Sequence, residues 1–277
     1  MLDLDLQGAH VLITGASGGI GLETTRLFLE QGAKVTAHYN ASSEPLQPYL
    51  SNPSVFLGQA DLTSESSVKS LFESATKTLG PVYIAVINHG IWIKDDVALK
   101  DMSLERWNKT MSTNLTSSFL VAREFLKGLE LATASHNGAE KDKEMIDQAS
   151  IVFVGSSAGK YGEAMHADYS ASKSAMMYGL TLTLKNEIVK IIPKGRVNCV
   201  APGWVHTPLA TEALKDPMVV YRALATTPLK KVAVPFDVAT QIAILASAKV
   251  SGHVTGHIVN VMGGMEGRLL NLQEDLA

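Results

Sequence analysis

The sequence has few of the features that mark secreted, membrane-spanning or nucleic-acid-binding proteins. Of its 277 residues only Cys199 is a cysteine, so no disulfide can form within the chain and nothing points to an oxidising compartment. No apolar run approaches the ~20 residues of a membrane-spanning helix, and the first residues, 1–7, do not resemble a signal peptide. The 24 basic and 27 acidic side chains nearly cancel, which excludes a strongly basic nucleic-acid binder. We expect a cytoplasmic protein without a nucleic-acid or membrane partner.

Short apolar runs alternate with longer amphipathic stretches along the chain. The alternation predicts a parallel sheet covered by helices on both faces. No internal repeat, low-complexity tract or linker divides the chain, so we expect one doubly wound, Rossmann-like α/β domain over residues 1–277. Helices are expected over 20–31, 64–79 and 168–191. The expected seven strands cover residues 10–13, 34–37, 55–57, 82–87, 151–154, 196–200 and 257–261.

Two segments depart from this alternation. Residues 133–148 are polar and charged, which predicts a surface insertion between a helix and the fifth strand. Residues 204–234 mix prolines with apolar side chains, and a long connection inside a compact domain is usually a lid or a binding loop. We expect a substrate lid over about 204–234; the alternative is a solvated loop with a short helix.

Glycines crowd the first predicted strand–helix junction, between Thr14 and Gly21. Glycine lets the backbone turn tightly and approach a pyrophosphate, and the helix N-terminus that follows attracts phosphate groups. The spacing, with glycines at Gly15, Gly19 and Gly21, matches neither the G-x-G-x-x-G fingerprint nor a P-loop. It also contains G-x-S-x-G around Ser17, but too few residues precede it for the strands of a hydrolase fold. We expect nucleotide binding.

The predicted second strand ends without a carboxylate, in the run from His38 to Ser43. In dinucleotide-binding folds an acidic residue here binds the adenosine ribose, and it would repel a 2′-phosphate. Asn40, Ser42 and Ser43 can donate hydrogen bonds to that phosphate, and His38 can help to bind it. No arginine is present to clamp it. We therefore expect NADP(H) in preference to NAD(H).

Tyr169 and Lys173 are four residues apart in a predicted helix, which places both side chains on one face. A lysine ammonium near a phenol lowers the tyrosine pKa from its usual ~10, so that the tyrosine can act as an acid or base near neutrality. Ser156 follows the predicted strand 151–154, and Asn88 to Gly90 follow 82–87. Ligand sites of parallel sheets lie beyond the carboxyl ends of the strands, so these side chains are expected in one crevice.

Together these motifs resemble the short-chain dehydrogenase/reductase family, from about residue 6 to residue 264. The resemblance implies that Tyr169 is the acid/base, that Ser156 binds the reacting oxygen, and that Lys173 lowers the tyrosine pKa and holds the nicotinamide ribose. It further implies that Asn114 anchors a water next to Lys173 and that the chain forms a homotetramer or homodimer. The motifs are Thr14-Gly15-xxx-Gly19-Ile20-Gly21, Asp61-Leu62, Asn88-His89-Gly90, Asn114, Ser156, Tyr169-xxx-Lys173 and Pro202-Gly203.

The resemblance also implies the cofactor contacts. Asp61 is expected at the adenine ring and Thr207 at the nicotinamide carboxamide. His89 stands where the family usually has alanine; its imidazole either contacts cofactor or substrate or points into solvent, and we favour solvent because the family uses the backbone there. The complete expected set is Gly15, Ser17, Gly19, Ile20, Gly21, Tyr39, Asn40, Ser42, Ser43, Asp61, Leu62, Asn88, Gly90, Tyr169, Lys173, Pro202, Gly203, Val205 and Thr207, with no metal.

The expected reaction is hydride transfer between NADP(H) and a ketone or 3-oxoacyl compound, giving a secondary alcohol. Besides Ser156, the expected substrate contacts are Trp92, His166, Trp204 and Met218, although apolar residues of the lid segment can equally pack onto the core. An NAD-dependent sugar or polyol dehydrogenase of the same fold and a non-catalytic nucleotide-binding sensor are the alternatives. An epimerase or dehydratase is less favoured because little chain follows residue 264.

Overall fold

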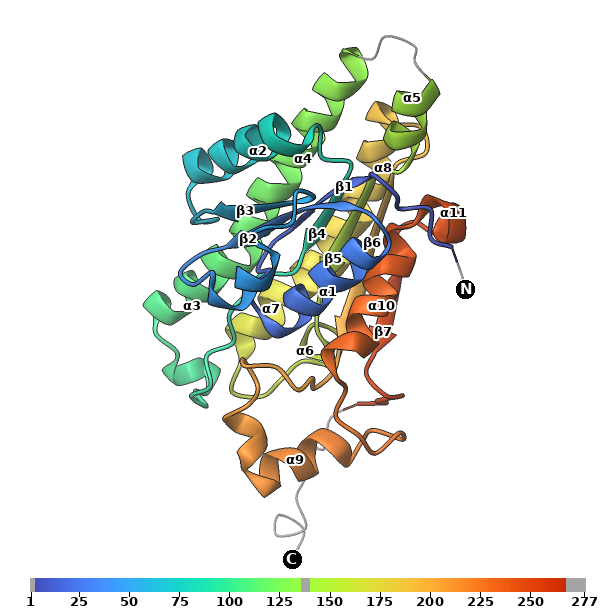
Figure 1. Ribbon diagram of the computed structural model, residues 1–277. Helices are drawn as coiled ribbons and strands as arrows, with labels where there is room; N and C mark the ends of the chain where they lie inside the picture. The colour runs from blue at the N-terminus through green and yellow to red at the C-terminus, as the bar shows by residue number, and fades with distance from the viewer. Residues whose placement is uncertain (1–2, 136–139, 268–277) are drawn as a thin grey trace, which may run out of the picture.

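Seven parallel strands form one sheet in this computed structural model, which describes residues 3–135 and 140–267 (Figure 1). The strand order is β3-β2-β1-β4-β5-β6-β7, so the chain winds outward from β1 in both directions. The predicted α/β fold with seven strands is confirmed. The strands are β1 His10–Ile13, β2 Lys34–Tyr39, β3 Val55–Gln59, β4 Ile84–Ile87, β5 Ser150–Val154, β6 Arg196–Pro202 and β7 Ile258–Val261.

Helices cover both faces of the sheet because each strand alternates its apolar side chains between them. α1 (Gly19–Glu30) and α10 (Pro235–Ala246) pack on one face, against side chains such as Val11 and Val200. α2 (Glu65–Leu79), α4 (Ser117–Ala134) and α8 (Thr181–Ile191) pack on the other, against Leu12 and Phe153. Both cores are closed by aliphatic and aromatic side chains with almost no exposed surface.

The remaining helices lie mostly at the two ends of the sheet. They are η1 Glu44–Tyr49, η2 Leu99–Asp101, α3 Leu104–Met111, η3 Ser112–Thr116, α5 Glu140–Asp147, α6 Ser157–Tyr161, α7 Ala167–Ser174, η4 Ala175–Leu180, η5 Ala213–Lys215, α9 Pro217–Leu224 and α11 Ala248–Ser251. No helix within the described ranges is long and apolar enough to span a bilayer.

Several predicted elements differ from the structure by one or two residues at an end, and two differences have a clear cause. β2 continues two residues beyond the prediction, because its pairing with β3 extends through His38 opposite Gly58 and Tyr39 opposite Gln59. The helix predicted over 168–191 is interrupted by the π-helical turn η4, where the N–H of Thr181 reaches the carbonyl of Met176 five residues earlier. Short amphipathic patterns do not reveal where a helix widens its turns.

The segment expected as a surface insertion, 133–148, is partly helical. α4 continues to Ala134 and α5 spans Glu140–Asp147, where Ile146 is buried against the core. Residues 136–139 of this segment lie outside the described residues. The apolar Ile146 explains why the end of a polar segment packs onto the domain.

The segment 204–234 leaves the end of β6 and returns next to its own start. Val205 forms a parallel bridge with Ala233, and the N–H of Ala233 donates to the carbonyl of Trp204 at 3.0 Å. Between these pinned ends the chain forms η5 and α9, and α9 lies well away from the sheet, at the bottom of the view (Figure 1). The segment is therefore an excursion that both begins and ends at the carboxyl edge of β6.

Cys199 lies in the middle of β6, beneath the loop that leaves β5. A Cβ on Gly155 would lie 3.1 Å from its sulfur, so the thiol is enclosed by backbone on that side. Burial raises the pKa of this thiol to about 12.

Candidate functional site

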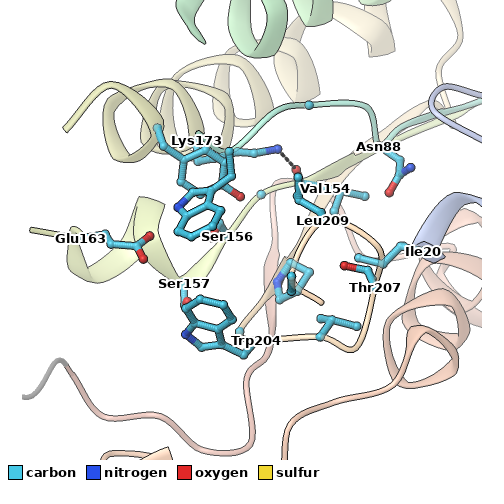
Figure 2. A pocket seen from close by; sticks show the side chains of 18 residues that line it. Ile20, Asn88, Val154, Ser156, Ser157, Glu163, Lys173, Trp204, Thr207 and Leu209 are labelled. Atoms are coloured by element: carbon cyan, nitrogen blue, oxygen red, sulfur yellow. Dashed lines mark hydrogen bonds between the residues drawn. The ribbon is translucent and has the colours of Figure 1, made fainter. Parts of the chain in front are cut away.

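Two hollows open at the carboxyl ends of the strands, and they share Ile20, Asn88, Gly90, Thr207 and Leu209. We call the larger, of about 1550 Å³, the groove, and the smaller, of about 810 Å³, the pocket. The groove follows the glycine loop and the ends of β2 and β3. The pocket lies over the ends of β5 and β6 (Figure 2). Because the hollows share these residues, a ligand lying along the groove can reach into the pocket.

The glycine loop forms the floor of the groove in a conformation that only glycine allows at two positions. Gly15 has a φ of 63°, and a Cβ on Gly21 would lie 2.1 Å from the carbonyl oxygen of Gly15. Asn88 fixes the loop, since its Nδ2 donates to the carbonyls of Thr14 at 3.0 Å and Gly15 at 3.2 Å. α1 starts at Gly19 within this lining, so its first N–H groups lie beside the groove, as a phosphate-binding site requires.

His38 supports the loop and does not serve the phosphate role expected for it. Its Nδ1 accepts a hydrogen bond from the N–H of Gly15 at 3.0 Å, and its Nε2 donates to the carbonyl of Ala60 at 3.0 Å. Burial lowers its pKa, so the imidazole is neutral and both nitrogens are engaged. The expectation that His38 helps to bind a 2′-phosphate is therefore corrected.

Of the other residues at the end of β2 that were expected at the ribose, only some line the groove. Asn40 and Ser42 line the groove, whereas Tyr39 packs onto the core. Ser43, which precedes η1, is not part of the groove wall. The alternation of side chains along a strand explains the position of Tyr39, since it turns away from the face that His38 occupies.

The opposite wall of the groove is formed by residues that follow β3. Asp61, Leu62 and Thr63 line it, and the Asp61 carboxylate accepts hydrogen bonds from the N–H and hydroxyl of Thr63 at 2.9 and 2.7 Å. These bonds lower the pKa of Asp61. No lysine or arginine lines the described part of the groove.

Lys173, Tyr169 and Ser156 meet in the pocket, as the sequence predicts. Lys173 is buried, and its Nζ donates a hydrogen bond to the carbonyl of Val154 at 2.9 Å (Figure 2). The same Nζ lies 5.9 Å from the centre of the Tyr169 ring. Burial lowers the pKa of Lys173 to about 8. Ser156 caps α6, its Oγ accepting from the N–H of Ala158 at 3.1 Å. Within the described residues this hydroxyl has no protein acceptor for its own proton, which leaves it able to donate to a ligand.

Asn114 is fully buried in the π-helical turn η3, next to the lysine. Its amide exchanges hydrogen bonds with the backbone of Ile91, Nδ2 donating at 3.0 Å and Oδ1 accepting at 2.8 Å. Nδ2 also lies 3.2 Å from the Ser172 hydroxyl on α7. A Cβ on Gly90 would lie 3.2 Å from Asn114 Oδ1 and 3.4 Å from Lys173 Nζ, so glycine lets the chain pass closely between them.

His89 does not point into solvent. Its ring lies between two hydroxyl groups, with Nδ1 2.8 Å from Thr14 Oγ1 and Nε2 2.6 Å from Ser117 Oγ. Burial lowers its pKa well below the usual value. The imidazole therefore links the glycine loop to α4 and lines the groove, a role that no local motif indicates.

The wall of the pocket farthest from the groove is aromatic and acidic. Trp92 and Trp204 both line it, in an edge-to-face contact at 5.9 Å. His166 is buried behind Trp92, with ring centres 4.8 Å apart, and does not itself line the pocket. Met218 lies on α9, about half exposed, and is not part of this wall either.

Glu163 and Ser157 also line the pocket, although the sequence analysis did not select them. Ser157 is adjacent to the predicted serine, and Glu163 lies in the loop between α6 and α7. Neither residue belongs to one of the motifs. The spacing between Ser156 and Tyr169 fixes the length of the loop, but it does not indicate which residue of the loop faces the pocket. Pro202, Gly203, Val205 and Thr207, which were expected at the cofactor, line the pocket at the end of β6, and Thr207 also lines the groove.

Comparison with known proteins agrees with this geometry. Residues 9–217 match the family model for short chain dehydrogenases. A 3-oxoacyl-[acyl-carrier-protein] reductase of Vibrio cholerae is 32% identical, with 95% of this chain and 99% of the relative covered. The corresponding reductase of Thermotoga maritima is 33% identical, with 94% and 98% covered.

A solved structure shows the same fold. The Brucella melitensis protein described as short-chain dehydrogenase/reductase SDR:Glucose/ribitol dehydrogenase has a TM-score of 0.81 at 28% identity, covering 95% of this chain and 99% of that one. The chain therefore belongs to the short-chain dehydrogenase/reductase family, as an NAD(P)-dependent dehydrogenase or reductase.

Proposed function

We propose that this protein is an NADP(H)-dependent oxidoreductase that interconverts a ketone or 3-oxoacyl compound and the secondary alcohol. The observation that carries the proposal is the meeting of Ser156, Tyr169 and Lys173 in a pocket that is continuous with the glycine-loop groove. The 3-oxoacyl reductases among the relatives support the direction and the substrate type. A non-catalytic sensor would need the groove but not the three side chains of the pocket.

The groove fits a dinucleotide along its length. The glycine loop and the start of α1, from Gly15 to Gly21, would hold the pyrophosphate. Asp61 and Leu62 would contact the adenine, and Pro202, Gly203, Val205 and Thr207 would hold the nicotinamide end. Bound there, the cofactor supplies the hydride, and the protein supplies binding, orientation and the proton.

Tyr169 is assigned as the acid/base. In reduction its phenol donates the proton to the carbonyl oxygen, and the Ser156 hydroxyl donates a hydrogen bond to the same oxygen as negative charge develops. The Lys173 ammonium, 5.9 Å from the phenol ring, favours the phenolate left by proton transfer. Asn114 holds the chain at Ile91 beside the lysine, and we assign it the role of anchoring a water there.

The preference for NADP(H) rests on neutral donors. Asn40 and Ser42 face the groove where a carboxylate would repel the 2′-phosphate. Because no lysine or arginine lines the described groove, we expect a modest preference, of about tenfold, from neutral hydrogen bonds. Parallel titrations of the purified protein with NADPH and NADH, read by nicotinamide fluorescence, measure it; tighter binding of NADH would overturn the cofactor proposal.

Replacement of the tyrosine tests the reaction. We expect Tyr169→Phe to lower kcat for carbonyl reduction at least ~100-fold, because the general acid is removed while the ring remains. NADPH binding should stay within about threefold of wild type, since the phenol oxygen provides at most one weak hydrogen bond to the ribose. Turnover at the wild-type rate would refute the assignment of Tyr169.

We also propose that 204–234 acts as a lid and that the chain forms a homotetramer or homodimer. The lid proposal is supported by the pinned ends of the segment and by Leu209 and Ala210, which it contributes to the pocket wall. The oligomer proposal is supported by Tyr178, which stands about half exposed on the outer side of η4, and by Phe119 on α4, exposed to a similar extent. Sedimentation velocity distinguishes a monomer from the assembly.

A further inference from the structure

A buried ion pair adjoins the tyrosine that is proposed as the acid/base. Arg106 lies on α3, and Asp168 lies in the first turn of α7, one residue before Tyr169. The Nε of Arg106 donates to Asp168 Oδ2 at 3.3 Å, and only 11% and 2% of the two side chains is exposed. Neither residue lines the pocket or the groove. The pair therefore lies next to the reacting group but outside the walls that a ligand would touch.

Asp168 is held in its ionised form. The Thr110 hydroxyl, also on α3, donates to Asp168 Oδ2 at 2.6 Å. Burial alone would raise the pKa of Asp168, but hydrogen bonds from Thr110, the Tyr169 backbone and Arg106 outweigh it and lower the pKa below its usual value. Both partners of the pair are therefore charged, and two side chains of α3 fasten the first turn of α7.

The same guanidinium also fastens two loops. Its Nη1 donates to the carbonyl of Asp95 at 2.7 Å, and its Nη2 donates to the carbonyl of Met165 at 3.5 Å. The two loops meet directly as well, since the N–H of Val97 donates to the Met165 carbonyl at 3.2 Å. Arg106 thus joins α3 to α7 and to both loops through three different nitrogens.

Both of these loops reach the wall of the pocket. Trp92, three residues before Asp95, lines the pocket, and so does Glu163, two residues before Met165. His166 packs against Trp92 with ring centres 4.8 Å apart, which connects the two loops a second time. A displacement of the loops relative to α7 would therefore change the position of the pocket wall relative to the acid/base.

Stability alone is a poor explanation for this pair. The cost of removing two charges from water roughly cancels their attraction, so a buried ion pair adds little net stability, although loss of one partner is strongly destabilising. What an arginine does provide is geometry, because its planar fork fixes the directions of its N–H groups. Three acceptors around the Arg106 guanidinium define where α7 and the two loops lie relative to α3.

We infer that Arg106 and Asp168 are positioning residues for the reaction: they set the place of Tyr169 relative to the pocket wall and so act on kcat without touching substrate or cofactor. This role presupposes the acid/base role proposed for Tyr169. A displacement of about 1 Å, caused by a change far from the chemistry, can lower a rate about 10²-fold. Cofactor binding should depend little on the pair, because the glycine loop and the ends of β2 and β3 form most of the groove.

A double variant separates positioning from folding. Arg106→Met alone leaves the Asp168 carboxylate buried without its arginine, so we expect Tm to fall by about 10 °C. Addition of Asp168→Asn removes that unpaired charge and should bring Tm back to within about 3 °C of wild type. With NADPH and ethyl acetoacetate, we expect kcat of the double variant to stay at least ~10-fold below wild type, while KM for NADPH changes less than about twofold.

A conservative variant and a remote one complete the set. Arg106→Lys keeps the charge beside Asp168 but lacks the fork, so we expect a Tm close to wild type and a kcat at least ~3-fold lower. It carries the test if Arg106→Met does not fold. Lys194→Met removes a 2.7 Å ion pair with Asp147 near the amino ends of β5 and β6, and it should keep the wild-type kcat.

The outcomes tell a positioning role from a purely structural one. A wild-type kcat in the double variant or in Arg106→Lys, at normal Tm, would show that the pair serves the fold alone. A KM for NADPH that rises in parallel with the loss of kcat would equally overturn the positioning role, because it would indicate a general loosening of the domain. Tyr169→Phe is assayed alongside: turnover at the wild-type rate would refute the acid/base role itself. An inactive Tyr169→Phe together with fully active Arg106 variants would refute only the role of the pair.

Discussion

Two buried cations of the described chain, Arg196 and Lys173, lie at opposite ends of the sheet and have different sets of hydrogen-bond acceptors. Arg196, at the amino end of β6, donates to the carbonyls of Leu245 at 2.5 Å, Ala246 at 2.7 Å and Ser251 at 3.3 Å, where α10 and α11 end. Lys173 lies on α7, and its Nζ reaches the carboxyl end of β5, where it donates to the Val154 carbonyl. This carbonyl is its one protein acceptor within the described chain. Burial lowers the pKa of both, Arg196 to about 10 and Lys173 to about 8.

The difference shows that the buried cation at the amino end of this sheet stabilises the fold, whereas the one at the carboxyl end is available to a ligand. Arg196 donates from both of its terminal nitrogens to carbonyl groups that helix ends leave unpaired, although its Nε has no partner among the described residues, so the guanidinium mainly serves the fold. Lys173 has a single protein acceptor among residues 3–135 and 140–267, so two of its N–H groups remain available there to a ligand. A buried cation left incompletely paired indicates a function that a ligand completes.

Removal of the lysine should give the largest effect on activity. We expect Lys173→Met to lower kcat/KM for carbonyl reduction about 10³-fold, since in the proposed mechanism the phenolate of Tyr169 loses the neighbouring charge and the cofactor loses a hydrogen-bond donor. Steady-state kinetics with NADPH measure it. Full activity would break the comparison, because both cations would then be structural.

Removal of the arginine should act on stability alone. We expect Arg196→Met to lower the free energy of unfolding by about 3 kcal/mol, because several buried carbonyls lose their donors. Urea unfolding measures this change. NADPH affinity of the folded variant should be unchanged; a large loss of affinity with normal stability would contradict the assignment of Arg196 to the fold.

Burial of the Lys173 charge should lower the free energy of unfolding, and this cost should decrease as the pH rises. Between pH 8 and 10.5 the unfolded chain holds the Lys173 proton that the folded protein has released, so wild-type stability gains relative to Lys173→Met as pH rises through this window. Below pH 8 both states are protonated and the full cost remains. Allowing for the lost bond to Val154, we expect Lys173→Met to be more stable than wild type by on the order of 2 kcal/mol at pH 7. Urea unfolding of both proteins at pH 7 and pH 10 tests this; a constant difference would show that burial does not shift the lysine.

The sequence predicted the parts of this molecule that depend on local pattern. The strands lie within two residues of their expected bounds because each is a short run of apolar or β-branched residues flanked by turns. Ser156, Tyr169 and Lys173 converge as predicted, since the carboxyl ends of parallel strands meet at one edge.

The features that the sequence did not predict depend on contacts between distant segments. His38 and His89 turn inward because the glycine loop and α4 offer them hydrogen-bond partners, which no local pattern encodes. Tyr39 turns to the core because β2 extends further along β3 than its composition indicates. Glu163 faces the pocket because α3 and the 95–97 segment set the turn that carries it.

The reactivity of Cys199 can report how often the β5–β6 region opens. The chain has no other thiol, and this one is buried, protonated and covered by Gly155, the residue before Ser156. An alkylating reagent can reach the sulfur only in molecules whose β5–β6 region has opened, so the rate of its modification measures that opening. Bound cofactor, which favours the closed form, should slow labelling in proportion to occupancy. The alkylation rate of Cys199 in the wild-type protein can thus be used to measure ligand binding.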